Sequence, residues 1–326
     1  MARITLSDSD EAFDCAPGDT ILRAALRAGV GMSYSCNVGS CGNCRFELLE
    51  GAVAHLRQDP PAWSEKDRAR GRWLGCQAAP QGDCRVKFRR DPAAVLAVQP
   101  EVRQGTLVAR RDLTSDMAEV DVRVTGGRDF LPGQYALLSL PGVEGARVYS
   151  MSNLPGSDLW QFIIRRVSGG SATTALFDRM RPGDALGVDG PYGLAYLRAD
   201  APRDLVLIAG GSGLSPMVSI ARAALAAPAG RNVHLFFGGR TPADLAATGV
   251  LAGHARLQVT GAVSTDTLGW TGETGFIHDV ADRHMGDRLA NCEIYFAGPP
   301  AMAQALLLTL RARGVPQAQV HFDEFY

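Results

Sequence analysis

The spacing of four cysteines constrains this chain more than any other feature of its sequence. Three of the seven cysteines, Cys36, Cys41 and Cys44, lie within nine residues, and Cys76 follows later. A disulfide framework is typical of short secreted chains with an even number of cysteines, and this sequence of 326 residues has an odd number. Clustered thiols in a reducing compartment indicate a metal site instead.

The spacing C-x4-C-x2-C with a fourth, distant cysteine is typical of a 2Fe–2S cluster held by four thiolates. The cluster carries net negative charge, so its loop must direct backbone N–H groups at its sulfurs. Gly39 and Gly42 would supply positive φ angles and close approach. A structural zinc site is the alternative, although zinc ribbons favour two C-x2-C pairs and only one occurs here. Cys15, Cys84 and Cys292 are expected to be small buried hydrophobic residues.

Charge and hydropathy exclude several classes of partner. The 33 Lys and Arg residues balance 34 Asp and Glu, and this net charge of −1 gives no footprint for nucleic acid. No apolar run reaches the ~18 residues needed to span a bilayer, so no membrane partner is expected. The N-terminal sequence has neither the basic nor the apolar region of an export signal. These observations predict a cytoplasmic protein.

The chain divides into three predicted domains and a linker. Residues 1–90 contain six of the seven cysteines, and residues 91–104, with two prolines and little periodicity, are interpreted as a linker. Residues 105–202 contain short alternating runs separated by Gly–Gly and Pro–Gly pairs, which predict a small antiparallel barrel. In residues 203–326, strands alternate with helices, which predicts a doubly wound parallel sheet.

Three motifs in a fixed order carry a family resemblance. Residues 1–90 resemble a plant-type ferredoxin in their cysteine pattern, and residues 147–150 (RVYS) are similar to the R-x-Y-S motif of ferredoxin-NADP reductase-like flavoproteins. Residues 210–216 (GGSGLSP) are similar to the G-G-x-G-x-x-P turn of that superfamily. The whole chain therefore resembles the NADH-dependent reductase component of a multicomponent bacterial oxygenase. The resemblance implies a β-grasp ferredoxin domain, an FAD-binding β-barrel and an NAD-binding domain.

The RVYS run has the chemistry that an FAD site needs. Arg147 is a permanent cation that can bind a pyrophosphate through two parallel N–H groups. Tyr149 offers a flat face to the isoalloxazine ring, and the Ser150 hydroxyl, a candidate catalytic group, can hydrogen-bond flavin N5. Taken alone, these four residues also fit an ordinary exposed strand.

A second turn is predicted to hold the FAD pyrophosphate, because small residues that open a helix leave N–H groups free for phosphate. Arg165 lies in the strand that lines the flavin in the family. The family's Gly-x-x-Ser/Thr turn corresponds to Gly170, Ser171, Ala172 and Thr173.

The GGSGLSP turn is predicted to bind the dinucleotide. Gly211 and Gly213 let the backbone approach a pyrophosphate, and the following helix, predicted to begin at Pro216, adds its positive N-terminal end. Gly238 and Arg240 end the next strand, where the family contacts the adenosine ribose. Arg240 is the only nearby cation in the sequence, and a 2′-phosphate site would show a cluster, so NADH is favoured over NADPH.

Two further segments are assigned by the resemblance. The run from Ala297 to Pro300 matches the family's C-G-P-P turn beside the nicotinamide, with Gly298 and Pro299 retained and Ala297 replacing the cysteine. Hydride transfer between cofactors needs no protein nucleophile, so the replacement is expected to modulate the rate only. Glu324, a candidate catalytic residue, and Phe325 resemble the tail that closes over the flavin, although a sheet-edge strand fits them equally.

The predicted function is a relay that splits electron pairs. NADH would reduce FAD, and single electrons would pass through the 2Fe–2S cluster to an oxygenase component or an intermediary ferredoxin. Residues 60–90 carry eight Lys and Arg against three Asp and Glu, which suits an acidic partner but also fits a solvated face. The alternatives are a reductase for another acceptor, such as a deoxysugar dehydratase, and a non-catalytic protein that binds zinc and nucleotides.

Overall fold

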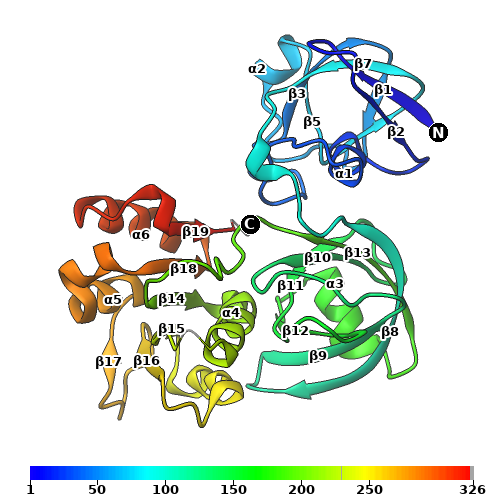
Figure 1. The fold of residues 1–326 in the computed structure, drawn as a ribbon. Coiled ribbons are helices and arrows are strands. Elements are labelled where there is room, and N and C mark those ends of the chain that lie inside the picture. Colours follow the sequence, from blue (N-terminus) through cyan, green and yellow to red (C-terminus); the bar gives the residue numbers. More distant parts are fainter. Residues whose placement is uncertain (229, 324–326) are drawn as a thin grey trace.

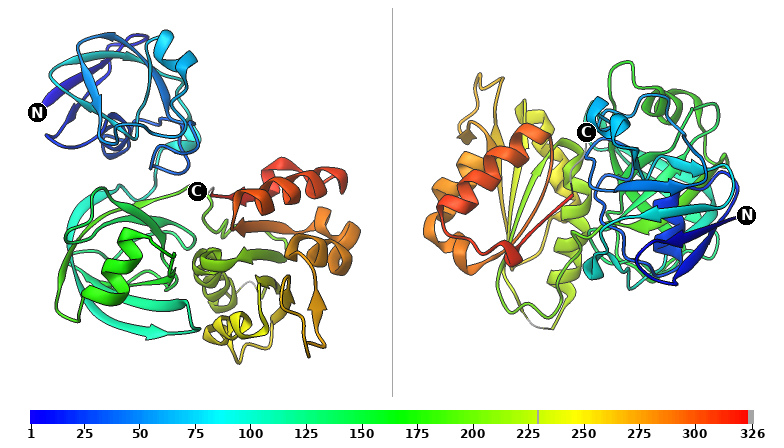
Figure 2. Two further views of the ribbon diagram at one scale, coloured as in Figure 1. Left: turned by 180° about the vertical axis from the view of Figure 1, so that it is seen from behind. Right: turned by 90° about the horizontal axis from the view of Figure 1, so that it is seen from above.

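The computed structural model describes residues 1–228 and 230–323, which fold into three domains in chain order. The N-terminal domain, in blue and cyan, lies above the other two, which stand side by side (Figure 1). From above, the N-terminal domain overlies the middle domain (Figure 2). The predicted order of a ferredoxin-like domain, an antiparallel barrel and a parallel sheet is confirmed.

A mixed five-stranded sheet and one helix form the core of the N-terminal domain. The strand order is β2-β1-β7-β3-β5, in which only β1 and β7 pair in parallel. Helix α1 (Ile21–Arg27) begins after Thr20, whose hydroxyl accepts a hydrogen bond from the Arg23 N–H at 3.4 Å. This is the β-grasp arrangement. The other elements are β1 (Ala2–Leu6), β2 (Ala12–Cys15), β3 (Arg45–Glu50), β4 (Val53–His55), α2 (Glu65–Ala69), β5 (Arg72–Leu74), β6 (Ala78–Pro80) and β7 (Cys84–Lys87).

The segment predicted as a linker is largely structured. It contains a 3₁₀ turn (Pro92–Ala94), and Ala94 and Leu96 are buried in the core of the N-terminal domain. The first barrel strand, β8 (Glu101–Asp112), already begins inside the expected linker. It does so because residues 101–106 pair with β13, which gives their backbone groups partners.

Six antiparallel strands form the middle domain in the order β11-β10-β13-β8-β9-β12. An isolated bridge between Met151 and Phe162 joins the end of β11 to β12, so the two outer strands close the sheet into a barrel. Its core contains alternate β9 residues, Val120, Val122 and Val124. The elements are β9 (Met117–Val124), β10 (Tyr135–Ser139), β11 (Arg147–Ser150), β12 (Leu159–Arg165), α3 (Ser171–Thr174), a π-helical turn (Ala175–Arg179) and β13 (Ala185–Tyr192).

The third domain is a parallel sheet in the order β17-β16-β15-β14-β18-β19, with helices on both faces. Leu205 and Leu207 of β14 pack with α4, whereas Val206 and Ile208 pack with α5 and α6. Burial on both faces explains why this strand is apolar throughout. The elements are β14 (Leu205–Gly210), α4 (Leu214–Ala226), β15 (Val233–Gly239), β16 (Leu257–Val263), β17 (Glu273–Thr274), α5 (Ile277–Met285), β18 (Glu293–Ala297), α6 (Pro300–Ala312), β19 (Val320–Phe322) and 3₁₀ turns at Gly211–Gly213, Pro242–Leu251, Gly286–Asn291 and Gln317–Gln319.

The N-terminal domain is fastened to the barrel by specific contacts. Arg27 of α1 forms an ion pair with Asp189 of β13 at 2.6 Å, and both side chains are mostly buried. The backbone N–H of Gly193, just after β13, donates to the hydroxyl of Tyr34 at 3.0 Å. These contacts hold the cysteine loop, which begins at Cys36, against the barrel.

Candidate functional site

Four thiols come together in the N-terminal domain as two pairs. Cys36 contacts Cys41, and Cys44 contacts Cys76. Within the described residues, no three Cys, His, Asp or Glu side chains surround a single metal position. A structural zinc ion needs four ligands around one centre, whereas a dinuclear cluster with four thiolates takes two on each iron. The pairing of the four thiols therefore fits a 2Fe–2S cluster.

Backbone N–H groups point at the sulfurs, as the predicted cluster requires. The N–H groups of Ser40 and Cys41 lie 3.3 and 3.4 Å from the Cys36 sulfur. The N–H of Cys76 lies 3.4 Å from the Cys44 sulfur. A hydrogen bond from the Cys41 thiol, together with the backbone groups, lowers the pKa of Cys36 to about 6 despite its burial. The backbone N–H groups thus favour the thiolate form of Cys36, while the shared hydrogen bond raises the pKa of Cys41.

Three residues of the loop adopt positive φ angles that shape it around the thiols. Gly39 and Gly42 have φ angles of 83° and 79°, which confirms the expectation for both glycines. Asn37 is the one non-glycine residue in the described part of the chain with positive φ, at 55°. Its side chain is buried, and its Nδ2 has no hydrogen-bond partner, while its Oδ1 accepts from Arg23 Nε at 3.3 Å. A buried amide donor beside Cys36 fits the sulfur acceptors of a cluster.

The three cysteines outside the motif behave as expected. Cys15, Cys84 and Cys292 are free and buried, and burial raises the pKa of each thiol. They are small apolar parts of the core rather than reactive groups.

The two FAD motifs meet at the edge of the barrel. Arg147 lies on β11, and its Nη2 is 3.5 Å from the hydroxyl of Ser171, at the start of α3. Its Nη1 donates to the backbone carbonyls of residues 144–146. Across the part of the chain that the structure describes, no carboxylate pairs with Arg147. A half-buried guanidinium without a carboxylate partner fits a diphosphate.

Tyr149 and Ser150 end β11, and as successive strand residues they present their side chains to opposite faces. Tyr149 is half-buried, and burial raises the pKa of its phenol to about 12, so the ring is neutral. Ser150 is buried, and its carbonyl accepts a 2.6 Å hydrogen bond from the hydroxyl of Ser215 on α4. Strand β11 is thus anchored directly to the third domain. The contacts of Tyr149 and Ser150 with the flavin remain predictions.

The predicted phosphate turn is held by its own side chains. The Thr173 hydroxyl accepts from the Val167 N–H at 3.2 Å and donates to the Gly170 carbonyl at 3.2 Å. A Cβ atom on Gly170 would lie 2.8 Å from that hydroxyl oxygen, so glycine is needed here. Ala172 and Thr173 are buried and Ser171 is exposed, so a phosphate would meet the Ser171 hydroxyl and backbone N–H groups.

The two glycine turns predicted to bind the dinucleotide adjoin each other. They follow β14 and β18, neighbouring strands between which the order of the sheet reverses. A Cβ atom on Gly213 would lie 2.0 Å from the Ala297 carbonyl oxygen, and one on Gly298 would lie 2.4 Å from Met302 Cε. Pro299 lies beside Gly210: a Cβ atom built on Gly210 would lie 3.1 Å from the Cδ of Pro299. Ligands of doubly wound sheets bind at this reversal point.

One sequence interpretation needs correction at this turn. Helix α4 begins at Leu214, two residues before Pro216, although Pro216 still lies in the first turn where its missing N–H costs no hydrogen bond. Arg165 ends β12, the strand predicted to line the flavin, and its contact with the flavin stays a prediction. Its Nη1 lies 3.2 Å from the position of a Cβ atom on Gly211, so its guanidinium also faces the turn after β14.

Comparison with known proteins identifies the architecture. Family models match the chain as a 2Fe-2S iron-sulfur cluster binding domain over residues 4–81, an oxidoreductase FAD-binding domain over residues 104–196 and an oxidoreductase NAD-binding domain over residues 207–307. The ferredoxin–NAD(P)+ reductase CarAd of Metapseudomonas resinovorans is 39% identical over 319 residues, 96% of each chain. This chain belongs to the ferredoxin–NAD(P)+ reductase components of oxygenase systems.

Other relatives of this reductase agree. The ferredoxin–NAD+ reductase component of the alkene monooxygenase system of Xanthobacter autotrophicus is 39% identical over 325 residues, 96% of this chain and 97% of its own. The solved ferredoxin reductase of carbazole 1,9a-dioxygenase has a TM-score of 0.94 and 37% identity, covering 99% and 98% of the two chains. The reductase therefore binds a 2Fe–2S cluster, FAD and a nicotinamide dinucleotide, and it transfers electrons within an oxygenase system.

Several contacts between the barrel and the third domain of the reductase involve residues that the sequence analysis did not identify. On α4, the Ser219 hydroxyl donates to the Asn153 carbonyl at 2.7 Å, and Arg222 donates to the Ser152 carbonyl at 3.0 Å. These contacts join residues about 70 positions apart, so no local pattern announces them. Together with the Ser215 contact, they hold α4 against the end of β11 and the residues that follow it.

The remaining predicted residues have mixed outcomes. Gly238 packs against Ile277, since a Cβ atom would lie 3.0 Å from the Ile277 Cβ, which explains this glycine without a ligand. Arg240 follows β15 and is exposed. Glu324 and Phe325 lie outside the described residues. Within residues 1–228 and 230–323, no helix has both the length and the apolar character that crossing a bilayer requires.

Proposed function

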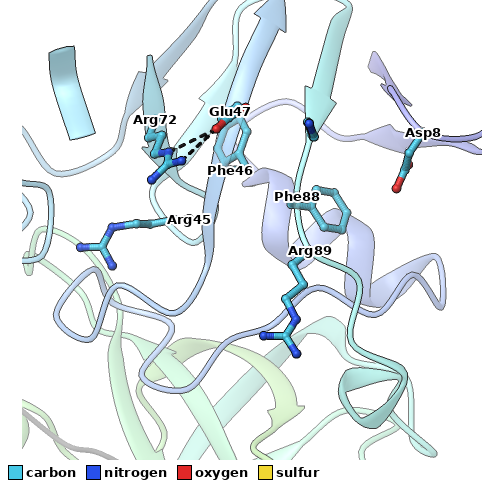
Figure 3. A pocket seen from close by; sticks show the side chains of 8 residues that line it. Asp8, Arg45, Phe46, Glu47, Arg72, Phe88 and Arg89 are labelled. Carbon is cyan, nitrogen blue, oxygen red and sulfur yellow. Dashed lines mark hydrogen bonds and ion pairs between the residues drawn. The ribbon is translucent and has the colours of Figure 1, made fainter. Parts of the chain in front are cut away.

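We propose that this reductase delivers single electrons to an acidic oxygenase component or intermediary ferredoxin that docks on the N-terminal domain beside the cluster. FAD, when bound, supplies the chemistry that converts a hydride into single electrons, and the cluster carries one electron at a time. The docking surface is a groove, here called the acceptor groove. It is lined by Asp8, Arg45, Phe46, Glu47, Arg72, Lys87, Phe88 and Arg89 (Figure 3).

The acceptor groove continues to the cluster loop. A second hollow shares Arg45 and Arg89 with it and reaches Asn43, which lies between the ligands Cys41 and Cys44. A partner seated in the groove would thus lie next to the residues that hold the cluster. This adjacency is the observation that carries the proposal, because electrons must leave from the cluster.

Unpaired positive charge selects an acidic partner. Four cationic side chains line the acceptor groove against two carboxylates. Arg72 is occupied by Glu47 at 3.1 Å, as Figure 3 shows, and Arg45 by Asp67 at 3.1 Å. Lys87 and Arg89 have no carboxylate partner among the described residues. These two exposed cations favour association with carboxylates, most strongly at low salt.

Anaerobic titration with NADH tests the relay. We expect absorbance of the flavin and of the cluster to fall together, and the reduced cluster to give an electron paramagnetic resonance signal. Loss of flavin absorbance alone would contradict the relay.

Charge reversal tests the docking. Lys87→Glu and Arg89→Glu are expected to raise the KM for an acidic plant-type ferredoxin at low ionic strength, with kcat nearly unchanged. Ferricyanide reduction, which needs no docked protein, is expected to stay the same. Arg123→Glu, an exposed barrel residue, is the matched control and is expected to leave the KM unchanged. If wild type and all three variants had the same KM, the acceptor groove would not be the docking surface.

A further inference from the structure

One carboxylate links two arginines across the boundary between the barrel and the third domain. Asp116 lies in the turn before β9, and its Oδ2 accepts from Arg165 Nε at 2.8 Å. The same oxygen accepts from Arg240 Nη2 at 3.0 Å. The Asp116 and Arg165 side chains are mostly buried, whereas Arg240 is 62% exposed. This three-residue group is here called the Asp116 clasp.

The Asp116 clasp spans the place where the adenosine half of a dinucleotide binds. Arg165 faces Gly211 in the turn after β14, where the pyrophosphate is expected. Arg240 directly follows β15, the strand beside β14. In doubly wound dinucleotide sites, the end of this second strand meets the ribose hydroxyl or its 2′-phosphate. A dinucleotide in this position therefore has the pyrophosphate near Arg165 and the ribose near Arg240.

We propose that Asp116 makes the reductase select NADH over NADPH. An arginine at the end of the second strand would by itself accommodate a 2′-phosphate. Here the guanidinium of Arg240 is already paired with the Asp116 carboxylate, so a 2′-phosphate would have to compete with that carboxylate for the cation. A 2′-phosphate would also place further negative charge beside Asp116, and like charges in contact are costly. The ribose of NADH has a neutral 2′-hydroxyl in that place, which is not repelled by the Asp116 carboxylate.

The Asp116 clasp does not disfavour the pyrophosphate of either nucleotide. Two arginines and one carboxylate leave one net positive charge, which suits a diphosphate common to both nucleotides. Because the pyrophosphate is the same in both nucleotides, the pairing of Asp116 with Arg165 affects them equally, and the difference between them arises at the 2′ position. Backbone bonds hold the turn, because the Asp116 N–H reaches the Thr114 hydroxyl at 3.4 Å and the Asp116 carbonyl accepts from the Arg166 N–H at 2.7 Å. The Thr114 hydroxyl also donates to Asp116 Oδ1 at 3.2 Å, an acceptor that asparagine retains. The side chain can therefore be changed while the turn is retained.

The test is nucleotide binding to the oxidised holoprotein, measured by calorimetry with NAD+, NADP+ and adenosine 2′,5′-bisphosphate. Asp116→Asn keeps the size of the side chain and frees Arg240. We expect the affinity for NADP+ and for the bisphosphate to rise by about tenfold or more relative to NAD+, the gain typical of one hydrogen bond to a charged group. Asp178→Asn, which removes the carboxylate paired with neighbouring Arg166 at 2.6 Å, is the matched control and should leave the ratio unchanged.

A second variant keeps the proposal testable if Asp116→Asn unfolds. Arg240→Ala alone is expected to change the NADP+ to NAD+ affinity ratio little, because Arg240 is already paired with Asp116. In the Asp116→Asn background it should abolish the gain. A large loss of NADP+ binding from Arg240→Ala alone, or an unchanged ratio in Asp116→Asn, would overturn the proposal.

The proposal rests on dinucleotide binding at the Gly211 turn, and the outcomes separate the two claims. Binding of NAD+ with an unchanged ratio rejects only the role of Asp116. Failure of wild-type protein to bind either nucleotide rejects the dinucleotide site and with it the relay from NADH.

Discussion

The phenolic hydroxyl of Tyr135 donates a 2.5 Å hydrogen bond to the backbone carbonyl of Ser35. Tyr135 lies opposite Ser150 in the pairing of β10 with β11, and Ser35 directly precedes the cluster ligand Cys36. The Tyr135 ring is fully buried. One side chain therefore links β10, the strand paired with the predicted flavin-binding strand β11, to the cysteine loop of the N-terminal domain.

Removal of this link should slow electron transfer from flavin to cluster. Tyr135→Phe keeps the ring and deletes the hydroxyl, so we expect reduction of the flavin by NADH at the wild-type rate and several-fold slower reduction of the cluster, followed by stopped-flow absorbance. Tyr34→Phe is the control, because it deletes the hydroxyl that accepts from Gly193 at the same interface. Equal slowing in both variants would show that general docking, not the Tyr135–Ser35 contact, sets the rate.

The potential of the cluster should depend on Asn37. Its buried Nδ2, which no described residue accepts, is placed to donate to a cluster sulfur, and donors stabilise the more negative, reduced state. Asn37→Ala should lower the midpoint potential by roughly 60 mV, equivalent to a hydrogen bond of about 1.4 kcal/mol. The measurement is a redox titration followed by electron paramagnetic resonance. Asn43→Ala, with an exposed side chain in the same loop, should leave the potential unchanged.

The local features of this protein could be predicted from sequence because their causes are local. The spacing of Cys36, Cys41 and Cys44 and the positive φ angles of Gly39 and Gly42 are set within one loop. The alternation of strands and helices in the third domain is likewise visible along the chain. Such local patterns are sufficient to predict the order of the domains and the types of cofactor.

The features that the sequence could not predict are set by contacts between distant residues. Gly213, directly before helix α4, packs closely against the Ala297 carbonyl of another strand. Arg165 faces the dinucleotide turn because Asp116 holds it there. Strand β8 enters the expected linker because it pairs with β13, about 85 residues later. No periodicity in either partner reveals these pairings.

Stability of the junction between barrel and third domain should depend on Ser215. Its buried hydroxyl donates to the Ser150 carbonyl at 2.6 Å and accepts from the Ile163 N–H at 2.9 Å. Ser215→Ala leaves two buried backbone groups without partners, which we expect to destabilise the protein by about 2–4 kcal/mol and to weaken FAD retention. Thermal melting and flavin release measure the two effects. Ser157→Ala, which removes an exposed hydroxyl bonded to one backbone N–H, should have little effect on either.

Asp323 should make stability depend on pH. Its carboxyl is buried where the three domains meet, with an oxygen 3.0 Å from the position of a Cβ atom on Gly193. Burial raises the pKa of Asp323 from 3.8 to about 7, although a hydrogen bond with the Leu194 backbone opposes the rise. Between these values the folded protein keeps a proton that the unfolded chain has lost. The free energy of unfolding therefore falls as the pH rises from about 4 to about 7, and the loss persists above pH 7.

Asp323→Asn should remove this loss, because the amide stays neutral at every pH. We expect the variant to melt at a higher temperature than wild type at pH 8, with up to about 4 kcal/mol gained, and to show a smaller advantage at pH 5. Asp200→Asn, at an exposed position, is the control and should shift neither curve. If the advantage of Asp323→Asn were the same at both pH values, the carboxyl would not be titrating in the folded protein, and its burial at the three-domain junction would carry no cost in stability.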